Sequence, residues 1–282
     1  MKLVSFRKDG RSAYGLVKGD GIVDVHARLG GEHATLRSLL DPEGLRLLAS
    51  LADAPADLPL ASVEFLPVVP DPEKVFCIGV NYLSHLIETG RPTPEHPMVF
   101  LRVASSQTGH LQPIVKPVDS EQLDFEGELA VIIGKGGRRI AKADAFDHVA
   151  GYACYNDGSI RDWQRHTSQF APGKNFDRTG AFGPWLVTAD EIGDPATLNI
   201  WTRLNGEVMQ QAPLSDLVFD IPTLIAYVSS FATLSPGDVI VTGTTGGVGA
   251  FRDPQLWMKP GDIVEIEVDR IGVLRNPVVA ES

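Results

Sequence analysis

The chain has 282 residues, of which 43% are hydrophobic and 22% are charged, and its formal net charge is −11. This composition is typical of a globular protein with one large domain, or with a large and a small one. An acidic chain without a basic run is not expected to bind nucleic acid. The two cysteines, Cys77 and Cys154, exclude a disulfide scaffold and favour a reducing, cytoplasmic location. No apolar run approaches the roughly 20 residues of a membrane span, so we expect no membrane partner.

Residues 1–70 predict a small N-terminal domain. Short apolar stretches separated by Asp9-Gly10 and Gly19-Asp20-Gly21 predict three strands of a meander. Leucines at helical spacing predict short helices between residues 35 and 53. The segment 55–72 contains five prolines and predicts an extended connector to the main domain.

The main domain, 71–282, is predicted to be rich in strands. Runs such as 74–80, 149–155 and 263–268 are apolar or β-branched and lie next to turn residues. Asn205-Gly206 predicts a hairpin between two further strands. Because strands outnumber helices and do not alternate with them, the predicted fold class is α+β, and a doubly wound sheet is excluded.

The segment 123–134 carries two acidic side chains beside an apolar run. We predict a strand here, on which Glu126 and Glu128 project to the same face. Two buried carboxylates repel each other, and a divalent cation would relieve that repulsion. Asp157, which follows the strand 149–155, would complete an all-oxygen site suited to Mg²⁺ or Mn²⁺, and less clearly to Ca²⁺. The alternatives are an edge strand with both glutamates in water and an Asx-turn at Asp157.

Three further positions are candidates for chemistry. His85 and Glu88 are spaced i, i+3 on a predicted short helix, as in a general base oriented by a carboxylate, although a surface ion pair has the same spacing. Lys174 follows a turn and would neutralise an oxyanion, unless it is simply solvated. The Gly-rich loop 242–249 lacks the lysine of a phosphate loop, but its amides and the Thr244 hydroxyl would suit a carboxylate; an ordinary turn is the alternative.

These candidates belong to motifs that follow one another along the chain from about residue 74 to residue 277. In this order they resemble the motifs of the fumarylacetoacetate hydrolase family. The matching stretches are Ile78–Tyr82 with His85 and Glu88, Asp124–Ala130, Asn156–Gln164, Gly173–Asp177, Thr242–Thr244, and Lys259–Asp262 with Gly272–Pro277.

The resemblance implies a mixed β-roll for the main domain and a homodimer. It also implies an enzyme of aromatic catabolism that hydrolyses the C–C bond of an acylpyruvate, such as fumarylpyruvate or maleylpyruvate, to pyruvate and a carboxylic acid. The alternatives are an oxaloacetate decarboxylase, a 2-oxo acid isomerase or hydratase, and a non-catalytic metal-binding dimer. Implied roles are metal ligands at Glu126, Glu128 and Asp157, a water-activating pair at His85 and Glu88, enolate stabilisation by Lys174, and substrate contacts at Gln164 and Thr244.

A dicarboxylate substrate would also need a cation for its far carboxylate. Arg102, Arg161 and Arg165 are the candidates, and we take Arg102 as the predicted substrate contact.

Overall fold

The computed structural model describes residues 1–282 and is built on two large sheets and a short two-stranded one. The larger sheet contains β1 (Lys2–Lys8), β2 (Arg11–Lys18), β3 (Gly21–Asp24), β4 (Leu58–Pro59), β5 (Glu64–Phe65), β6 (Val75–Gly79), β7 (Met98–Arg102), β8 (Gln107–Thr108), β11 (Gly127–Ile133), β12 (Val149–Asn156), β14 (Gly180–Thr188) and β17 (Val239–Val241). The five-stranded sheet contains β9 (Ile114–Lys116), β15 (Asn199–Leu204), β16 (Glu207–Pro213), β18 (Ile263–Val268) and β19 (Gly272–Ala280). β10 (Leu123–Asp124) pairs with β13 (Ser159–Ile160). The predicted α+β class, rich in strands, is confirmed.

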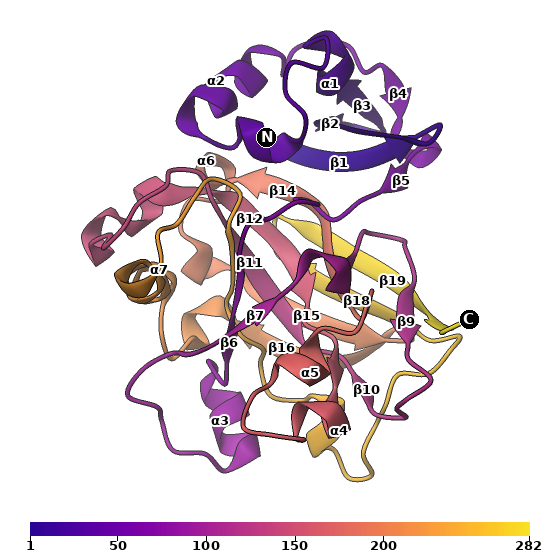
Figure 1. The fold of residues 1–282 in the computed structure, drawn as a ribbon, viewed down its shortest axis with the longest axis vertical. Helices are drawn as coiled ribbons and strands as arrows, with labels where there is room; N and C mark the ends of the chain where they lie inside the picture. Colours follow the sequence, from indigo (N-terminus) through magenta and orange to yellow (C-terminus); the bar gives the residue numbers. More distant parts are fainter.

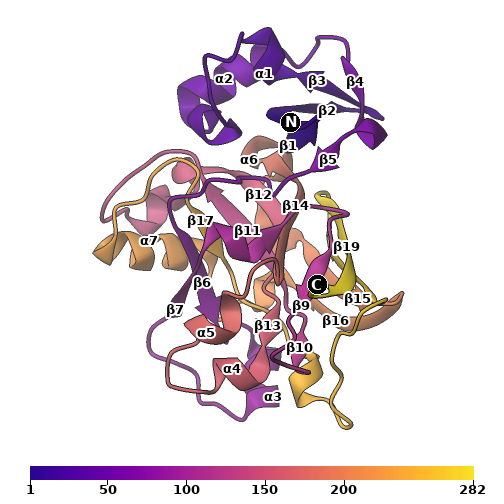
Figure 2. The same ribbon diagram turned by 45° about the vertical axis from the view of Figure 1, so that its right-hand side comes forward.

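Helices are few and short. They are α1 (Val25–Arg28), α2 (Pro42–Ser50), α3 (Leu83–Thr89), α4 (Arg161–Gln164), α5 (Ala171–Lys174), α6 (Ala189–Ile192) and α7 (Ile221–Phe231). The segment 161–176 contains α4 and α5. Together with α3, these two helices lie at the end of the molecule away from the N-terminal strands (Figures 1 and 2). The helices are too short or too polar to serve as membrane spans.

The N-terminal strands continue the main sheet. The predicted meander of β1, β2 and β3 is present, and β1 pairs antiparallel with β14, with Leu3 opposite Leu186. Leu39 and Leu40 belong to the same buried cluster as Ile132 of β11. The domain boundary near residue 70 stays a prediction, since hydrogen bonds and core packing cross it.

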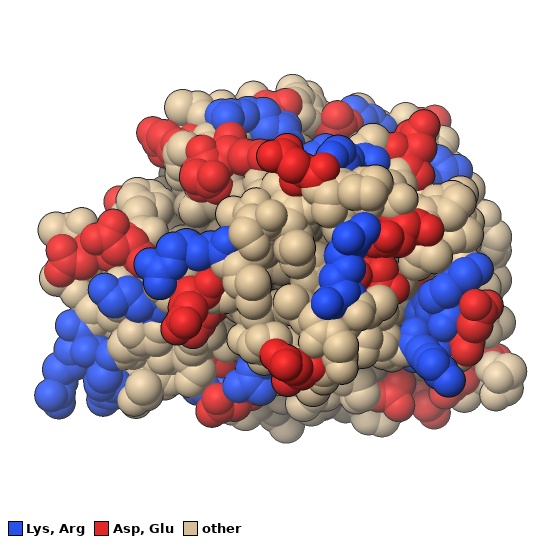
Figure 3. Space-filling model, turned by 90° about the horizontal axis from the view of Figure 1, so that it is seen from above, with Lys and Arg blue, Asp and Glu red and all other residues tan.

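Acidic and basic side chains are interspersed on the face of the molecule seen from above (Figure 3).

Strand β11 is buried on both faces, which explains its continuous apolar sequence. Leu129, Val131 and Ile133 pack in the core that includes residues of the five-stranded sheet. Ala130 and Ile132 pack on the opposite side, in the core shared with the N-terminal strands. The start of β11 is therefore held rigidly from both sides.

The predicted strand over 123–134 is interrupted just before β11. Glu126 lies between β10 and β11, and its N–H donates to the Asn156 side-chain oxygen at 3.0 Å. Asn156 therefore satisfies the amide that a continuous ladder would have paired.

Protonation of His110 should lower the stability of the fold in acid. Burial, helped by the charge of Arg275, lowers the pKa of His110 to about 4, and its Nδ1 accepts a hydrogen bond from the Arg275 amide at 3.1 Å. In the unfolded chain this pKa is about 6.5, so between the two values the unfolded state binds more protons. The free energy of unfolding should fall by at most about 3 kcal/mol from this group as the pH falls through that window.

Urea unfolding of wild type and His110→Gln at pH 7 and pH 4.5 measures this effect. Glutamine keeps an acceptor but does not titrate, so this variant should lose less stability than wild type. The variant His166→Gln removes an exposed histidine and serves as the control. Parallel losses in wild type and His110→Gln would contradict the prediction.

Candidate metal centre and active site

Three acidic side chains meet where β11 begins and β12 ends. The two strands are antiparallel, with Gly127 opposite Asn156, and the Asp157 N–H donates to the Glu126 carbonyl at 2.9 Å. This register brings Asp157 beside Glu126 and Glu128. One carboxylate oxygen from each residue lies within 4.8 Å of the others, and all three residues are buried. The structure thus brings together the three carboxylates that we predicted as metal ligands.

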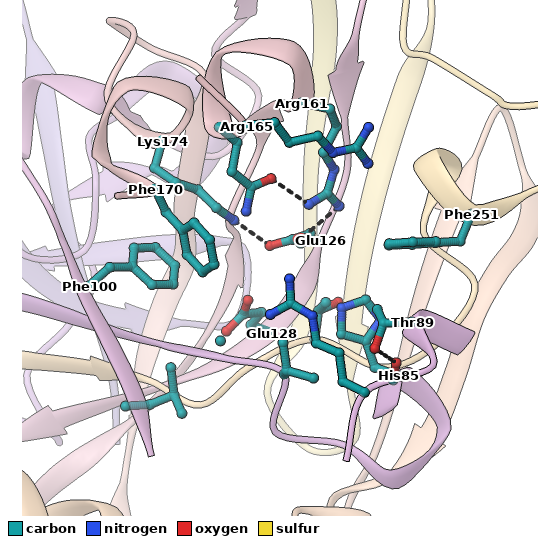
Figure 4. Close-up of a pocket in the computed structure, with 16 residues that line it drawn as sticks. His85, Thr89, Phe100, Glu126, Glu128, Arg161, Arg165, Phe170, Lys174 and Phe251 are labelled. Carbon is teal, nitrogen blue, oxygen red and sulfur yellow. Dashed lines mark hydrogen bonds and ion pairs between the residues drawn. The ribbon is translucent and has the colours of Figure 1, made fainter. Parts of the chain in front are cut away.

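Buried cations neutralise two of these carboxylates. Lys174 Nζ donates to Glu126 at 2.6 Å and to Asp157 at 2.7 Å. Arg161 approaches Glu126 from the other side and forms an ion pair with it at 2.6 Å (Figure 4). Burial alone would raise the pKa of Glu126, but Arg161 and Lys174 lower it to about 2. Glu126 is therefore held as the anion.

Glu128 has no such cation. Its carboxylate accepts a hydrogen bond from the Gly243 N–H, and no arginine or lysine pairs with it. Burial, together with the charges of Asp157 and Glu126, raises its pKa well above the usual range. A cation bound among the three carboxylates would reverse that shift.

The donor set fits a hard divalent ion. Carboxylate oxygens are the ligands that Mg²⁺ and Mn²⁺ prefer, and water or substrate oxygens commonly complete their coordination. The charge balance agrees, because three cations face four carboxylates in this buried cluster. The carboxylates are those of Asp124, Glu126, Glu128 and Asp157, and the cations are those of Arg102, Arg161 and Lys174.

His85 and Glu88 form the predicted pair on α3. His85 Nδ1 lies 2.9 Å from one Glu88 oxygen, and the other Glu88 oxygen accepts the Gly247 N–H at 2.8 Å. With Nδ1 turned to the carboxylate, Nε2 is the nitrogen left for chemistry. His85 lines the same cavity as Glu126 and Glu128.

That cavity has a volume of about 90 Å³ and is lined by six of the nine predicted site residues; Glu88, Arg102 and Asp157 lie behind its lining. Gln164 accepts a hydrogen bond from Arg161 at 3.0 Å, and its amide nitrogen has no partner within the chain. The Thr244 hydroxyl donates to the Gly127 carbonyl at 3.0 Å. The lining residues include His85, Glu126, Glu128, Gln164, Lys174 and Thr244.

Arg102 lies elsewhere. It is 3% exposed and does not line the cavity. Its guanidinium pairs with Asp157 and donates to the Gly158 carbonyl at 3.0 Å and to Thr179 at 3.1 Å. Its remaining donors bond to the Ser106 hydroxyl and carbonyl, at 3.2 and 3.4 Å, which leaves none free for a substrate, so the structure places Arg102 apart from the other predicted substrate contacts. Arg102 instead holds the Asp157 carboxylate in place.

Comparison with known proteins agrees with this geometry. Residues 74–279 match the family described as fumarylacetoacetate (FAA) hydrolase, C-terminal. The chain belongs to this family. The mitochondrial oxaloacetate tautomerase of Xenopus laevis is 40% identical over 99% of the chain and 90% of the relative, and its Homo sapiens counterpart FAHD2A is 42% identical over 93% and 85%.

Solved structures of the fumarylacetoacetate hydrolase family share the fold. Maleylpyruvate hydrolase from Sphingobium sp. SYK-6, in complex with manganese(II) ion and pyruvate, superposes with a TM-score of 0.84 at 35% identity. Fumarylacetoacetate hydrolase from Exiguobacterium antarcticum superposes with the same TM-score at 34% identity. Each comparison covers 100% of both chains. Both of these solved structures are of hydrolases, one of them in complex with manganese, whereas the two curated relatives named above are oxaloacetate tautomerases.

Gln210 is a site residue of this family member that our sequence reasoning missed. It lies on β16 of the five-stranded sheet and is 2% exposed. Its side-chain oxygen accepts the Gly127 N–H at 3.0 Å, and its nitrogen donates to the Thr244 hydroxyl at 2.7 Å and to the Thr245 carbonyl at 2.9 Å. It thus fixes the peptide between Glu126 and Glu128 together with the loop at Thr244. An isolated glutamine in a hairpin strand gives no local signal of this role.

Replacing Gln210 should weaken metal binding. In Gln210→Met the Gly127 N–H loses its acceptor and the Thr244 hydroxyl loses the hydrogen bond that Gln210 donates to it. We expect Mg²⁺ or Mn²⁺ affinity to fall about 10- to 100-fold, the usual effect of changing a group that orients metal ligands. Titration calorimetry of the metal, beside urea unfolding, separates this effect from loss of fold.

Two variants sharpen the test. Gln211→Met changes the exposed neighbouring glutamine and should bind metal as wild type does. Gln210→Glu keeps the acceptor for Gly127 but loses both donated bonds. Its metal affinity should therefore lie between that of wild type and that of Gln210→Met. Metal affinity of Gln210→Met equal to that of wild type would refute the assigned role.

Proposed function

We propose that the protein is a divalent-metal-dependent hydrolase that cleaves the C–C bond of an acylpyruvate, such as fumarylpyruvate or maleylpyruvate, to pyruvate and a carboxylic acid. One observation carries the proposal: Glu126 and Glu128, two of the three clustered carboxylates, line the same cavity as a histidine whose Nδ1 is held by Glu88. A site that only bound metal would have no need of an oriented base beside it.

Glu126, Glu128 and Asp157 would hold Mg²⁺ or Mn²⁺, with Ca²⁺ as a weaker candidate. When bound, the ion would supply Lewis acidity toward the carboxylate and 2-oxo oxygens of the substrate.

The remaining chemistry falls to side chains of this chain. Glu88 accepts a hydrogen bond from Nδ1–H of His85, so Nε2 has a lone pair with which to remove a proton from water. The hydroxide formed attacks the acyl carbonyl, the C–C bond breaks, and the electron pair of that bond passes to the pyruvate fragment. Lys174 bridges Glu126 and Asp157, lines the cavity, and stabilises the negative charge that develops on the 2-oxo oxygen. Return of the proton to carbon completes pyruvate.

Oxaloacetate tautomerisation is the second candidate, and the curated relatives at 40–42% identity favour it. This reaction moves a proton between C3 and the 2-oxo oxygen. It needs the same stabilisation of the enolate but no attacking water. His85 would then transfer a proton to and from carbon rather than activate water.

A homodimer and a cytoplasmic location complete the proposal. Size-exclusion chromatography with light scattering tests the homodimer, and cell fractionation tests the location.

A substrate panel with and without chelator tests both candidates. We expect EDTA to abolish cleavage of fumarylpyruvate and maleylpyruvate, and Mg²⁺ or Mn²⁺ to restore it. His85→Ala should lower kcat/KM for cleavage about 10²- to 10⁴-fold, the usual contribution of a general base. Release of pyruvate, measured with lactate dehydrogenase, gives the rates.

His96→Ala, which removes an exposed histidine, is the control and should leave the rate unchanged. Turnover of enol-oxaloacetate without cleavage of any acylpyruvate would select the tautomerase. Full cleavage activity after exhaustive removal of divalent ions would refute both.

A further inference from the structure

Two arginines lie where the catalytic cavity opens into an outer groove. The cavity and the groove share five lining residues, and these mark the junction between them. The shared residues are Arg91, Phe100, Gln164, Arg165 and Phe170. Arg91 follows α3, and Arg165 directly follows α4, so the two arginines reach the junction from separate segments.

These arginines are the free cations of the site. Arg161 forms ion pairs with Asp124 and Glu126, and Lys174 forms an ion pair with Glu126; both cations are buried. Arg91 and Arg165 are exposed, and neither forms an ion pair or a side-chain hydrogen bond within the chain. Their donors are therefore available to a ligand.

The junction is also free of competing acids. The outer groove has no aspartate or glutamate in its lining; besides the shared residues it contains Met98, Val99, Thr167, Ser168 and Gln169. In a chain of net charge −11 this is a local excess of positive charge. Such a mouth attracts anions and raises their rate of association.

Two apolar rings line the junction together with the arginines. The Phe100 ring lies 5.1 Å from Lys174 Nζ and packs edge-on against Phe170, with 5.7 Å between the ring centres. The lining therefore combines the carboxylates and Lys174 of the cavity with two phenylalanines and two arginines at the junction. A matching ligand has an anionic 2-oxo acid end, an apolar carbon segment and a second anion.

We propose that Arg91 and Arg165 form a subsite for the far carboxylate of a dianionic 2-oxo acid whose two anionic ends are separated by several carbons. The subsite rests on the proposed function, because the 2-oxo acid end must occupy the catalytic cavity. It favours acylpyruvates with a terminal carboxylate over oxaloacetate, whose second carboxylate is only one carbon beyond the 2-oxo group. Arginine suits this role because its planar guanidinium binds a carboxylate through two parallel hydrogen bonds.

A matched pair of ligands tests the subsite without turnover. 2-Oxoadipate and 2-oxohexanoate have the same carbon chain, and only the first has a far carboxylate. In the presence of Mg²⁺ we expect wild type to bind 2-oxoadipate about tenfold more tightly by titration calorimetry, as one charge-assisted hydrogen-bonded contact would give. The double variant Arg91→Gln/Arg165→Gln should bind both ligands equally, with the affinity for 2-oxohexanoate unchanged.

The control is Arg11→Gln, which removes an exposed, unpaired arginine on the β1–β2 hairpin and should keep the tenfold preference. Equal binding of the two ligands by wild type would overturn the subsite while leaving the proposed function intact. Failure of wild type to bind either ligand with Mg²⁺ would instead overturn the proposed function.

Kinetics provide an independent comparison. The double variant should lose about tenfold in kcat/KM for fumarylpyruvate but little for acetylpyruvate, which lacks the far carboxylate, and little for oxaloacetate. An equal loss for all three substrates would contradict a subsite and indicate general attraction of anions instead.

Discussion

Compensation of negative charge in a dry interior is the constraint on which the site depends. Carboxylates that are nearly inaccessible to water repel one another, and their burial is costly unless each finds a partner. Arg102 supports Asp157, Arg161 supports Glu126, and Lys174 bridges the two. Glu128 alone lacks a cationic partner, and this asymmetry indicates where a further positive charge belongs. Metal binding would therefore complete the cluster rather than add to one already neutral.

The sheets supply the rigidity that such a cluster requires. β11 is packed on both faces, and its pairing with β12 sets the relative positions of Glu126 and Asp157. Gly127 lies against β15 so closely that a Cβ there would meet the Thr202 hydroxyl at 2.0 Å. This close approach allows Gln210, from the hairpin partner of β15, to reach the Gly127 amide. The five-stranded sheet thus contributes to the site without providing a metal ligand.

The base and the Gly-rich loop are held together as well. Glu88 orients His85 and also accepts the Gly247 N–H, while Ser84 accepts the Gly246 N–H at 3.0 Å. Helix α3 and the loop 242–249 are therefore coupled through two bonds. Movement of the loop would disturb both the tautomer of His85 and the position of Thr244.

The sequence predicted the strand-rich class and the grouping of Glu126, Glu128 and Asp157, because strand patterns and acidic spacing are local signals. Resemblance to a family supplied the order in which the motifs combine. Side chains that become partners only through tertiary packing leave no local signal in the sequence. Arg102 was a candidate substrate contact because a cation can bind a carboxylate. In the structure its guanidinium instead bonds to Asp157 and Thr179. The break before β11 was missed for a similar reason, since Asn156 supplies from another strand the bond that permits it.

Hydrolysis and tautomerisation share the enolate, so the carboxylate cluster by itself does not separate them. The difference between the two reactions lies in the length of the substrate and in the presence of water at the base. In our proposal, the far carboxylate of a long acylpyruvate reaches the exposed arginines at the mouth of the cavity. Oxaloacetate, with one carbon between its 2-oxo group and its second carboxylate, is not expected to reach them. The residues at the mouth would then select between the two reactions, and neither arginine there pairs with a metal-binding carboxylate. Such residues can change without loss of the buried charge balance, which gives a physical reason for one fold to accommodate the tautomerases and hydrolases that this chain resembles.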